Sequence, residues 1–224
     1  RVGSAGGGEG ERIDCGGMTL LPGLFDSHAH LSYDYYNGVI RLDDFKLLIN
    51  SSLSAKRYLA MGFTTIRDMG APKRLSVRVR EAVARGLFVG PRIVSGGMIL
   101  RPPASDRPAD PNCFLRYVSG PEEYARAARE EIGGGADFVK LYAPGEPSEL
   151  LPEEMEAAVR IAHRLGRRVA VHAHDPGAID MCLEYGADTI EHASHIRPDQ
   201  IERLRSGEQH IVPTLAVLSS DIPT

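Results

Sequence analysis

Four histidines and one lysine lie at positions from which their side chains could bind metal ions. His28 and His30 end an apolar run over residues 24–31. A strand there would turn both imidazoles to the same side, as two ligands of one ion require. This pair alone is a weak signal, because alternate histidines also occur on half-exposed strands without a metal. The other candidates, later in the chain, are Lys140, His172 and His192.

Lys140 lies in the run Asp-Phe-Val-Lys-Leu-Tyr, where a period of two places Phe138, Lys140 and Tyr142 on one face. A lysine that points into a closed interior is costly unless it is paired or chemically modified. Two interpretations stay open. The lysine either extends along a helix layer toward solvent, or it forms a carbamate with carbon dioxide, an anion with two oxygens that can bridge two metal ions.

His172 and His174 alternate at the end of one apolar run, and His192 follows another. Each of these histidines alone is more often a hydrogen-bonded structural residue than a ligand. Three strands that each end in a histidine, with a lysine from a fourth, instead predict one shared site.

The elements that must position these residues follow one repeated pattern, in which an amphipathic helix ends at a glycine and a short apolar run follows. The predicted helices cover residues 52–61, 75–85, 121–132, 152–165, 176–185 and 198–205, and the predicted strands cover 24–31, 63–68, 92–95, 136–142, 168–172, 187–192 and 211–215. This alternation is typical of a parallel sheet with crossover helices.

A closed barrel is favoured over a doubly wound sheet, because the polar residues follow the strands and no glycine-rich phosphate fingerprint follows the first one. We therefore predict an α/β fold, a (β/α)8 TIM-type barrel with about seven strands, in which the eighth strand is missing. Residues 1–20 are interpreted as the remnant of an accessory β-sandwich domain and residues 21–224 as the barrel. Residues 96–118 are expected to form an extended loop above the third strand.

The amino-acid composition limits which binding partners and which cellular compartment we expect for this chain. The 26 basic and 30 acidic residues are mixed along the chain, and this leaves no basic stripe for nucleic acid. No apolar run reaches the length of a membrane span. The cysteines Cys15, Cys113 and Cys182 are few and widely spaced, which favours reduced thiols and a cytoplasmic location.

Together these residues resemble the amidohydrolase superfamily of metal-dependent hydrolases. The chain is most similar to the branch that includes prolidase-like dipeptidases and imidazolonepropionase-related enzymes. The matching pieces are Leu-Pro-Gly-Leu-Phe-Asp-Ser-His-Ala-His from residue 21, Gly-Phe-Thr-Thr-Ile-Arg-Asp-Met-Gly from 62, Asp-Phe-Val-Lys from 137, Val-His-Ala-His from 171 and Ile-Glu-His from 190.

This resemblance implies a centre of two zinc ions or two ions of another divalent metal. It assigns His28 and His30 to one ion, His172 and His192 to the other, and N6-carboxylated Lys140 to a bridge between them. A hydroxide that bridges the ions would be the nucleophile. Relatives use an aspartate at the end of the eighth strand as acid and base, so no catalytic residue can be assigned in this sequence.

Weaker assignments concern the surroundings of the site. His174 is expected to contact substrate, with a surface histidine as the alternative, and Tyr142 is expected to line the pocket unless it packs in the core. Arg67 and Asp68 are expected to form a structural ion pair. His195 is a lesser competitor of His192, while His163 and His210 are interpreted as structural.

The expected function is hydrolysis of an amide bond in a small-molecule substrate, which would be a dipeptide, an N-acyl amino acid or a cyclic amide. The alternatives are a mononuclear deaminase on the same barrel and a truncated, non-catalytic barrel that only binds ligand. Lys140 favours the binuclear hydrolase over the deaminase. Barrels of this type often pair, so a homo-oligomer is among the expected partners.

The chain departs from many relatives where Ser95-Gly-Gly-Met replaces a Gly-Gly-His element.

Overall fold

The structure is a computed structural model that describes residues 13–32, 44–103, 114–143, 145 and 149–218. Strands and helices alternate through most of this part of the chain. The strands are β1 (Leu24–Ala29), β2 (Phe63–Asp68), β3 (Arg92–Ser95), β4 (Ile99–Arg101), β5 (Leu115–Tyr117), β6 (Phe138–Ala143), β7 (Arg168–Ala173), β8 (Thr189–His192) and β9 (His210–Val212). The helices are α1 (Asp44–Ala60), α2 (Leu75–Ala84), α3 (Pro121–Gly133), α4 (Pro152–Arg164), α5 (Pro176–Tyr185), α6 (Pro198–Ser206) and α7 (Leu215–Leu218), with a 3-10 turn, η1 (Pro72–Arg74).

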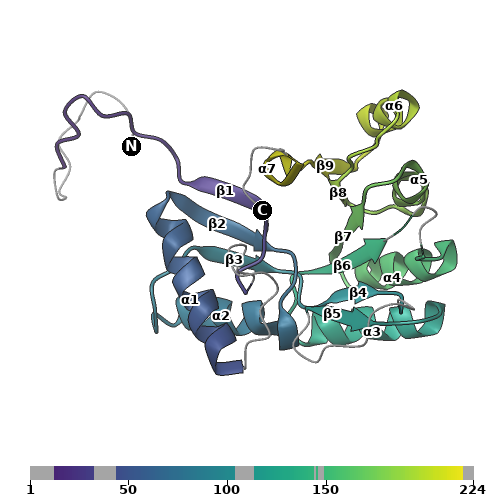
Figure 1. Cartoon of the computed structure of the whole chain (residues 1–224), viewed down its shortest axis with the longest axis horizontal. Helices are drawn as coiled ribbons and strands as arrows, with labels where there is room; N and C mark the ends of the chain where they lie inside the picture. The colour runs from purple at the N-terminus through teal and green to yellow at the C-terminus, as the bar shows by residue number, and fades with distance from the viewer. Residues whose placement is uncertain (1–12, 33–43, 104–113, 144, 146–148, 219–224) are drawn as a thin grey trace.

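The strands form a curved parallel wall in two hydrogen-bonded pieces. One sheet has the order β1-β2-β3 and the other the order β5-β4-β6-β7-β8-β9, and every ladder is parallel. The amide of Asp137 donates to the carbonyl of Ser95 at 2.7 Å and so links the two sheets. The larger helices lie along the outside of this wall (Figure 1). The fold is therefore a partial barrel of the (β/α)8 type, with all seven predicted strands present.

The segment after β3 differs from the extended loop that the sequence predicts. Ile99 and Leu100 are buried in β4, which pairs with both β5 and β6. Apolar side chains at these two positions make a strand against β6 more favourable than an exposed loop. Residues 104–113, which include part of the predicted loop, lie outside the described residues, as does Cys113.

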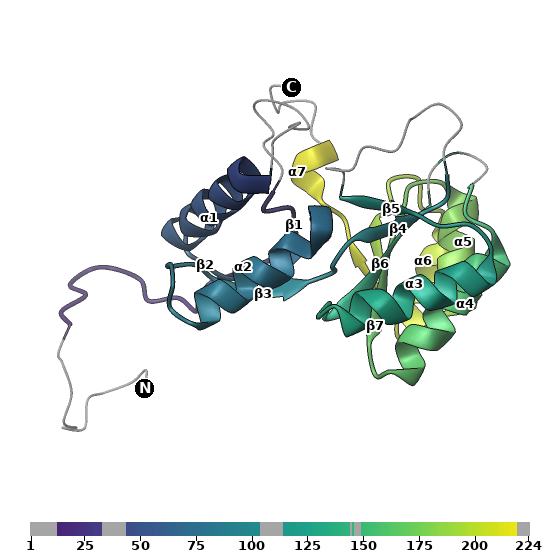
Figure 2. The same cartoon turned by 90° about the horizontal axis from the view of Figure 1, so that it is seen from below.

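Two apolar cores fix the strands against their helices. The larger lies between the second sheet and α3, α4 and α5, where Leu141, Val171 and Ile190 are fully buried. The smaller lies between the first sheet and the pair α1 and α2, where Ile66 and Val79 are fully buried. Figure 2 shows these two halves side by side, with β3 close to the α3 side of the molecule. The predicted first helix begins well before residue 52, at Asp44.

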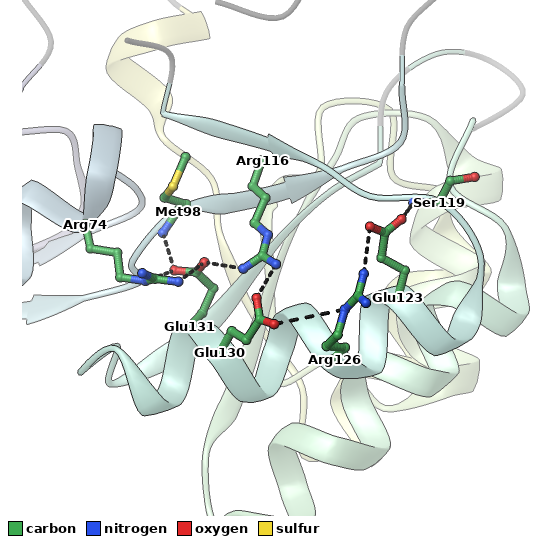
Figure 3. A network of polar contacts seen from close by, with 8 residues as sticks. All are labelled: Arg74, Met98, Arg116, Ser119, Glu123, Arg126, Glu130 and Glu131. Carbon is green, nitrogen blue, oxygen red and sulfur yellow. Dashed lines mark hydrogen bonds and ion pairs between the residues drawn. The ribbon is translucent and has the colours of Figure 1, made fainter. Parts of the chain in front are cut away.

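A buried carboxylate connects the two halves. Glu131 of α3 accepts hydrogen bonds from Arg74 Nε at 2.8 Å, from Arg116 Nη1 at 3.1 Å and from the amide of Met98 at 3.1 Å (Figure 3). The side chain of Glu131 is fully buried. Because Arg74 precedes α2 and Met98 precedes β4, one carboxylate holds three segments that surround the β3–β6 junction.

The described residues before β1 form a turn at Gly16–Gly17 but no strand. Their assignment to an accessory domain stays a prediction. Among the helices that the structure describes, none is long and apolar enough to cross a membrane.

Candidate metal centre

A cavity of about 430 Å³ lies at the carboxyl ends of the barrel strands. Its lining includes His28, His30, Lys140, Tyr142, His172 and His192. All five residues that the sequence predicts as metal ligands thus lie around one cavity, although they come from β1, β6, β7 and β8. The closeness follows from the parallel topology, which brings the ends of these strands to one rim.

The imidazole rings are close enough to one another to bind shared metal ions. The ring centroids of His28 and His30 are 5.6 Å apart, and His192 lies 4.8 Å from His28 and 4.5 Å from His172. His192 therefore stands between the histidines of β1 and that of β7.

Hydrogen bonds on the far side of two rings set which nitrogen faces the cavity. His30 Nδ1 lies 3.0 Å from the carbonyl oxygen of Gly70, and His28 Nδ1 lies 2.7 Å from Glu191 Oε2. Both partners are acceptors, so Nδ1 carries the proton and Nε2 keeps a lone pair. Histidines that bind metal are commonly oriented by this type of contact.

Glu191 was assigned no role from the sequence, yet it is a buried polar centre inside the barrel. Its carboxylate accepts hydrogen bonds from the guanidinium of Arg67 and from Thr189 Oγ1, at 2.8 Å, in addition to His28. Burial alone raises the pKa of Glu191, but the hydrogen bond from His28 and the charge of Lys140 lower it to about 2. The group is therefore a carboxylate.

The predicted ion pair between Arg67 and Asp68 is wrong. The two residues are neighbours on a strand, so their side chains point to opposite faces. Arg67 reaches Glu191 on one face, while Asp68 accepts hydrogen bonds from the amides of Leu31, at 2.8 Å, and Gly70, at 3.1 Å, on the other. Asp68 thereby holds the backbone just after His30.

The backbone at the end of β8 is unusual. His192 has φ 74° and Ala193 has φ 51°, in the left-handed region that non-glycine residues seldom adopt. In a regular strand Glu191 and His192 would face opposite sides, but here both act inside the barrel. His192 Nδ1 lies 2.6 Å from Thr214 Oγ1. Strain of this type is common at functional sites.

Lys140 is the most unusual group in the cavity. Its side chain is 1% exposed and its Nζ atom has no hydrogen-bond partner among the described residues. Burial lowers the pKa of Lys140 to about 8. A neutral amine at this position could react with carbon dioxide, and the resulting carbamate would be an anion among neutral imidazoles. The orphaned nitrogen therefore fits the predicted modification.

Burial also keeps the imidazoles neutral, as metal binding requires. It lowers the pKa of His28 to about 4 and that of His192 to about 3, and it lowers the pKa values of His30 and His172 as well.

His174 takes a different place from the other candidates. It lines a smaller neighbouring cavity of about 220 Å³ together with Tyr142, His172 and His195. However, one ligand nitrogen from each of His172, His174 and His192 lies within 4.8 Å of the others, so these three could also hold one ion.

The histidines interpreted as structural lie away from these cavities. His163 Nε2 is 2.8 Å from Asp188 Oδ2 at the other end of the strands, and His210 is exposed at the start of β9.

The sequence contained a signal for Glu191, since an acidic residue in the otherwise apolar run before His192 needs a buried partner.

Comparisons with known proteins agree with this geometry. A profile of the amidohydrolase family matches residues 19–213. Ochratoxinase from Aspergillus niger is 27% identical over 242 residues, which cover 89% of this chain and 48% of that protein. Two solved structures, a Xaa-Pro dipeptidase with bound methionine in the active site and a prolidase complexed with N-methylphosphonate-L-proline, are 26% and 27% identical, with TM-scores of 0.77 and 0.79. Each alignment covers 87% of this chain and 53% of the other. The chain thus spans about half the length of these relatives.

Proposed function

This chain belongs to the amidohydrolase family, and from that premise we propose that it supplies the metal site of a hydrolase that cleaves an amide bond. The observation that carries the proposal is the buried, unpartnered Nζ of Lys140 in a cavity lined by four histidines. A buried lysine without a hydrogen-bond partner among the described residues is costly there, and conversion to a metal-bridging carbamate would remove that cost.

Two divalent cations, which we propose to be zinc, fit the donor set. His28 and His30 would hold one ion, His172 and His192 the other, and carboxylated Lys140 would bridge them. Neutral imidazoles and one anionic bridge are the donor types that zinc prefers. The hydrogen bonds at Nδ1 of His28 and His30 leave the second nitrogen of each ring available.

When bound, such cations lower the pKa of water and polarise a carbonyl group, which is the chemistry that amide hydrolysis needs. Residues of this chain would position the metal ligands and the substrate. Glu191 holds the His28 ring, Tyr142 lines the side of the cavity, and His174 is placed to contact substrate from the neighbouring cavity. No described residue is assigned as the proton acceptor.

The proposed substrates are dipeptides, N-acyl amino acids or cyclic amides. The names of the related dipeptidase, prolidase and ochratoxinase support a small amide substrate. We further propose a cytoplasmic enzyme, without nucleic acid or membrane partners, that is able to form a homo-oligomer.

Metal analysis with a substrate panel tests this proposal. We expect about two zinc ions per chain, loss of one in Lys140→Ala, and no loss in the control Lys73→Ala, whose side chain is half-exposed and does not line the cavity. Release of amino acid from a panel of dipeptides and N-acyl amino acids would be measured in parallel. A chain that binds no zinc and hydrolyses none of the panel is a ligand-binding barrel instead.

A second candidate is a mononuclear enzyme, of which a deaminase is the nearest example. It is favoured by the three nitrogens of His172, His174 and His192, which could bind one ion without Lys140. One zinc per chain that is retained in Lys140→Ala would select it.

A further inference from the structure

Arg101, the last residue of β4, places a buried cation beside the cavity. Its side chain is 10% exposed. The β4–β6 ladder aligns Ile99 with Lys140 and Leu100 with Leu141, so Arg101 lies level with Tyr142. Ile99 lines the cavity, and a period of two puts Arg101 on the same face of the strand.

The aromatic ring of Tyr142 lies between the guanidinium group of Arg101 and the candidate ligand His172. Arg101 Cζ lies 5.0 Å from the centroid of the Tyr142 ring. That ring stacks on His172 with a centroid distance of 4.0 Å and an angle of 20°. The guanidinium group of Arg101 therefore packs over the Tyr142 ring, and the same ring packs against His172, a proposed metal ligand.

One hydrogen-bond donor of Arg101 is left without a partner by the described residues. Its Nε atom is buried and has no hydrogen-bond partner in the described part of the chain. Within the described part of the chain, the nearest carboxylate oxygen is Glu149 Oε2, which is 3.9 Å from Nη2 and belongs to a side chain that is 48% exposed. By contrast, Arg74 and Arg116 both donate hydrogen bonds to Glu131 at 2.8 to 3.1 Å. A buried guanidinium with free donors is a ready site for an anion.

We propose that Arg101 binds a carboxylate group of the substrate. The planar fork of arginine matches the two oxygens of a carboxylate better than any other side chain does. Dipeptides and N-acyl amino acids carry a free carboxylate on the carbon that is bonded to the scissile nitrogen, whereas a simple cyclic amide does not. The inference rests on the proposed function and narrows its substrates to amides with a free carboxylate.

Binding of two matched probes tests the proposal. N-acetyl-L-alanine and N-acetyl-L-alaninamide differ only in the carboxylate, and each would be titrated by NMR into the chain as purified and after chelation of metal. We expect the acid to bind about tenfold or more tightly than the amide, because a hydrogen bond to a charged group is lost in the amide. Arg101→Met should abolish this difference and Arg101→Lys should restore part of it.

The control Arg126→Met removes the same charge from an exposed position on α3 and should leave the difference unchanged. Circular dichroism would establish that each variant is folded. Equal affinity for the two probes, no detectable binding of the acid, or an undiminished difference in folded Arg101→Met would overturn the proposal. Because the titration is repeated without metal, these results are independent of whether the chain binds zinc or hydrolyses amides.

Discussion

Glu191 Oε2 lies 2.7 Å from His28 Nδ1, although the two residues are 163 positions apart in the chain. The contact crosses the interior of the barrel from β8 to β1. It makes the orientation of one proposed metal ligand depend on a strand that is distant in sequence and also provides His192.

Replacing Glu191 is therefore expected to weaken metal binding without removing any ligand. Glu191→Ala should lower zinc affinity by about 10- to 100-fold, because the His28 ring loses the acceptor that fixes its tautomer. Glu191→Gln, which keeps an acceptor oxygen, should have a smaller effect. Competition with a chromogenic chelator measures both.

Thr189→Val is the matched control, since it removes a second donor to Glu191 but keeps the contact with His28. It should change zinc affinity much less than Glu191→Ala does. Equal losses in the two variants would mean that Glu191 acts through general packing.

Lys140→Met is expected to stabilise the metal-free, bicarbonate-free chain at pH 7. Burial lowers the pKa of Lys140 from 10.5 to about 8, so below pH 8 the folded chain holds a costly buried ammonium. A lowering of this size corresponds to about 3 kcal/mol of folding free energy. Urea denaturation measures the gain.

The lowered pKa of Lys140 also predicts how the stability gain of Lys140→Met depends on pH. Between about pH 8 and 10.5 the unfolded chain holds a proton that the folded chain has released, so the stability of the unsubstituted protein rises with pH. The advantage of Lys140→Met should be largest below pH 8 and fall through this window. A constant advantage from pH 7 to 10.5 would contradict the prediction, because it would mean that folding does not lower the pKa of Lys140.

Glu131→Ala is expected to destabilise the chain by about 3 kcal/mol, because it leaves two partly buried arginines without their shared carboxylate. Glu130→Ala is the matched control, since the neighbouring Glu130 side chain is about half exposed and also pairs with Arg116. Its effect should be much smaller. Urea denaturation at pH 7 compares the two, and similar losses would contradict a special role for Glu131.

Much of the fold could be predicted because its signals are local. Glycines after amphipathic runs mark the ends of helices such as α5, and apolar runs mark strands such as β7. The candidate ligands could be found because parallel strands bring their carboxyl ends together whatever the loops do.

What the sequence did not predict depends on tertiary contacts. Period two assigns Glu191 and His192 to opposite faces, and the positive φ of His192 alters that arrangement. The partner of Arg67 lies on a strand 124 positions later, and no local pattern encodes that pairing. Likewise, Arg101 becomes notable only once β4 is seen to pair with β6.

The place of His174 decides between the two arrangements of the metal centre. If His172 and His192 hold one ion of a pair, His174 is free to contact substrate, and His174→Ala should keep both zinc ions. If His172, His174 and His192 hold a single ion, the same change should remove it, because each nitrogen is then a ligand.

His172→Ala is the reference variant, since it removes a ligand in either arrangement. We expect His174→Ala to retain the zinc content of the unsubstituted chain and to weaken substrate binding, while His172→Ala loses zinc. His174 Nδ1 already bonds to Ser194 Oγ at 2.7 Å, which anchors the ring beside the smaller cavity. Zinc content measured by atomic absorption separates the two cases, and equal loss of zinc in both variants would favour the mononuclear site.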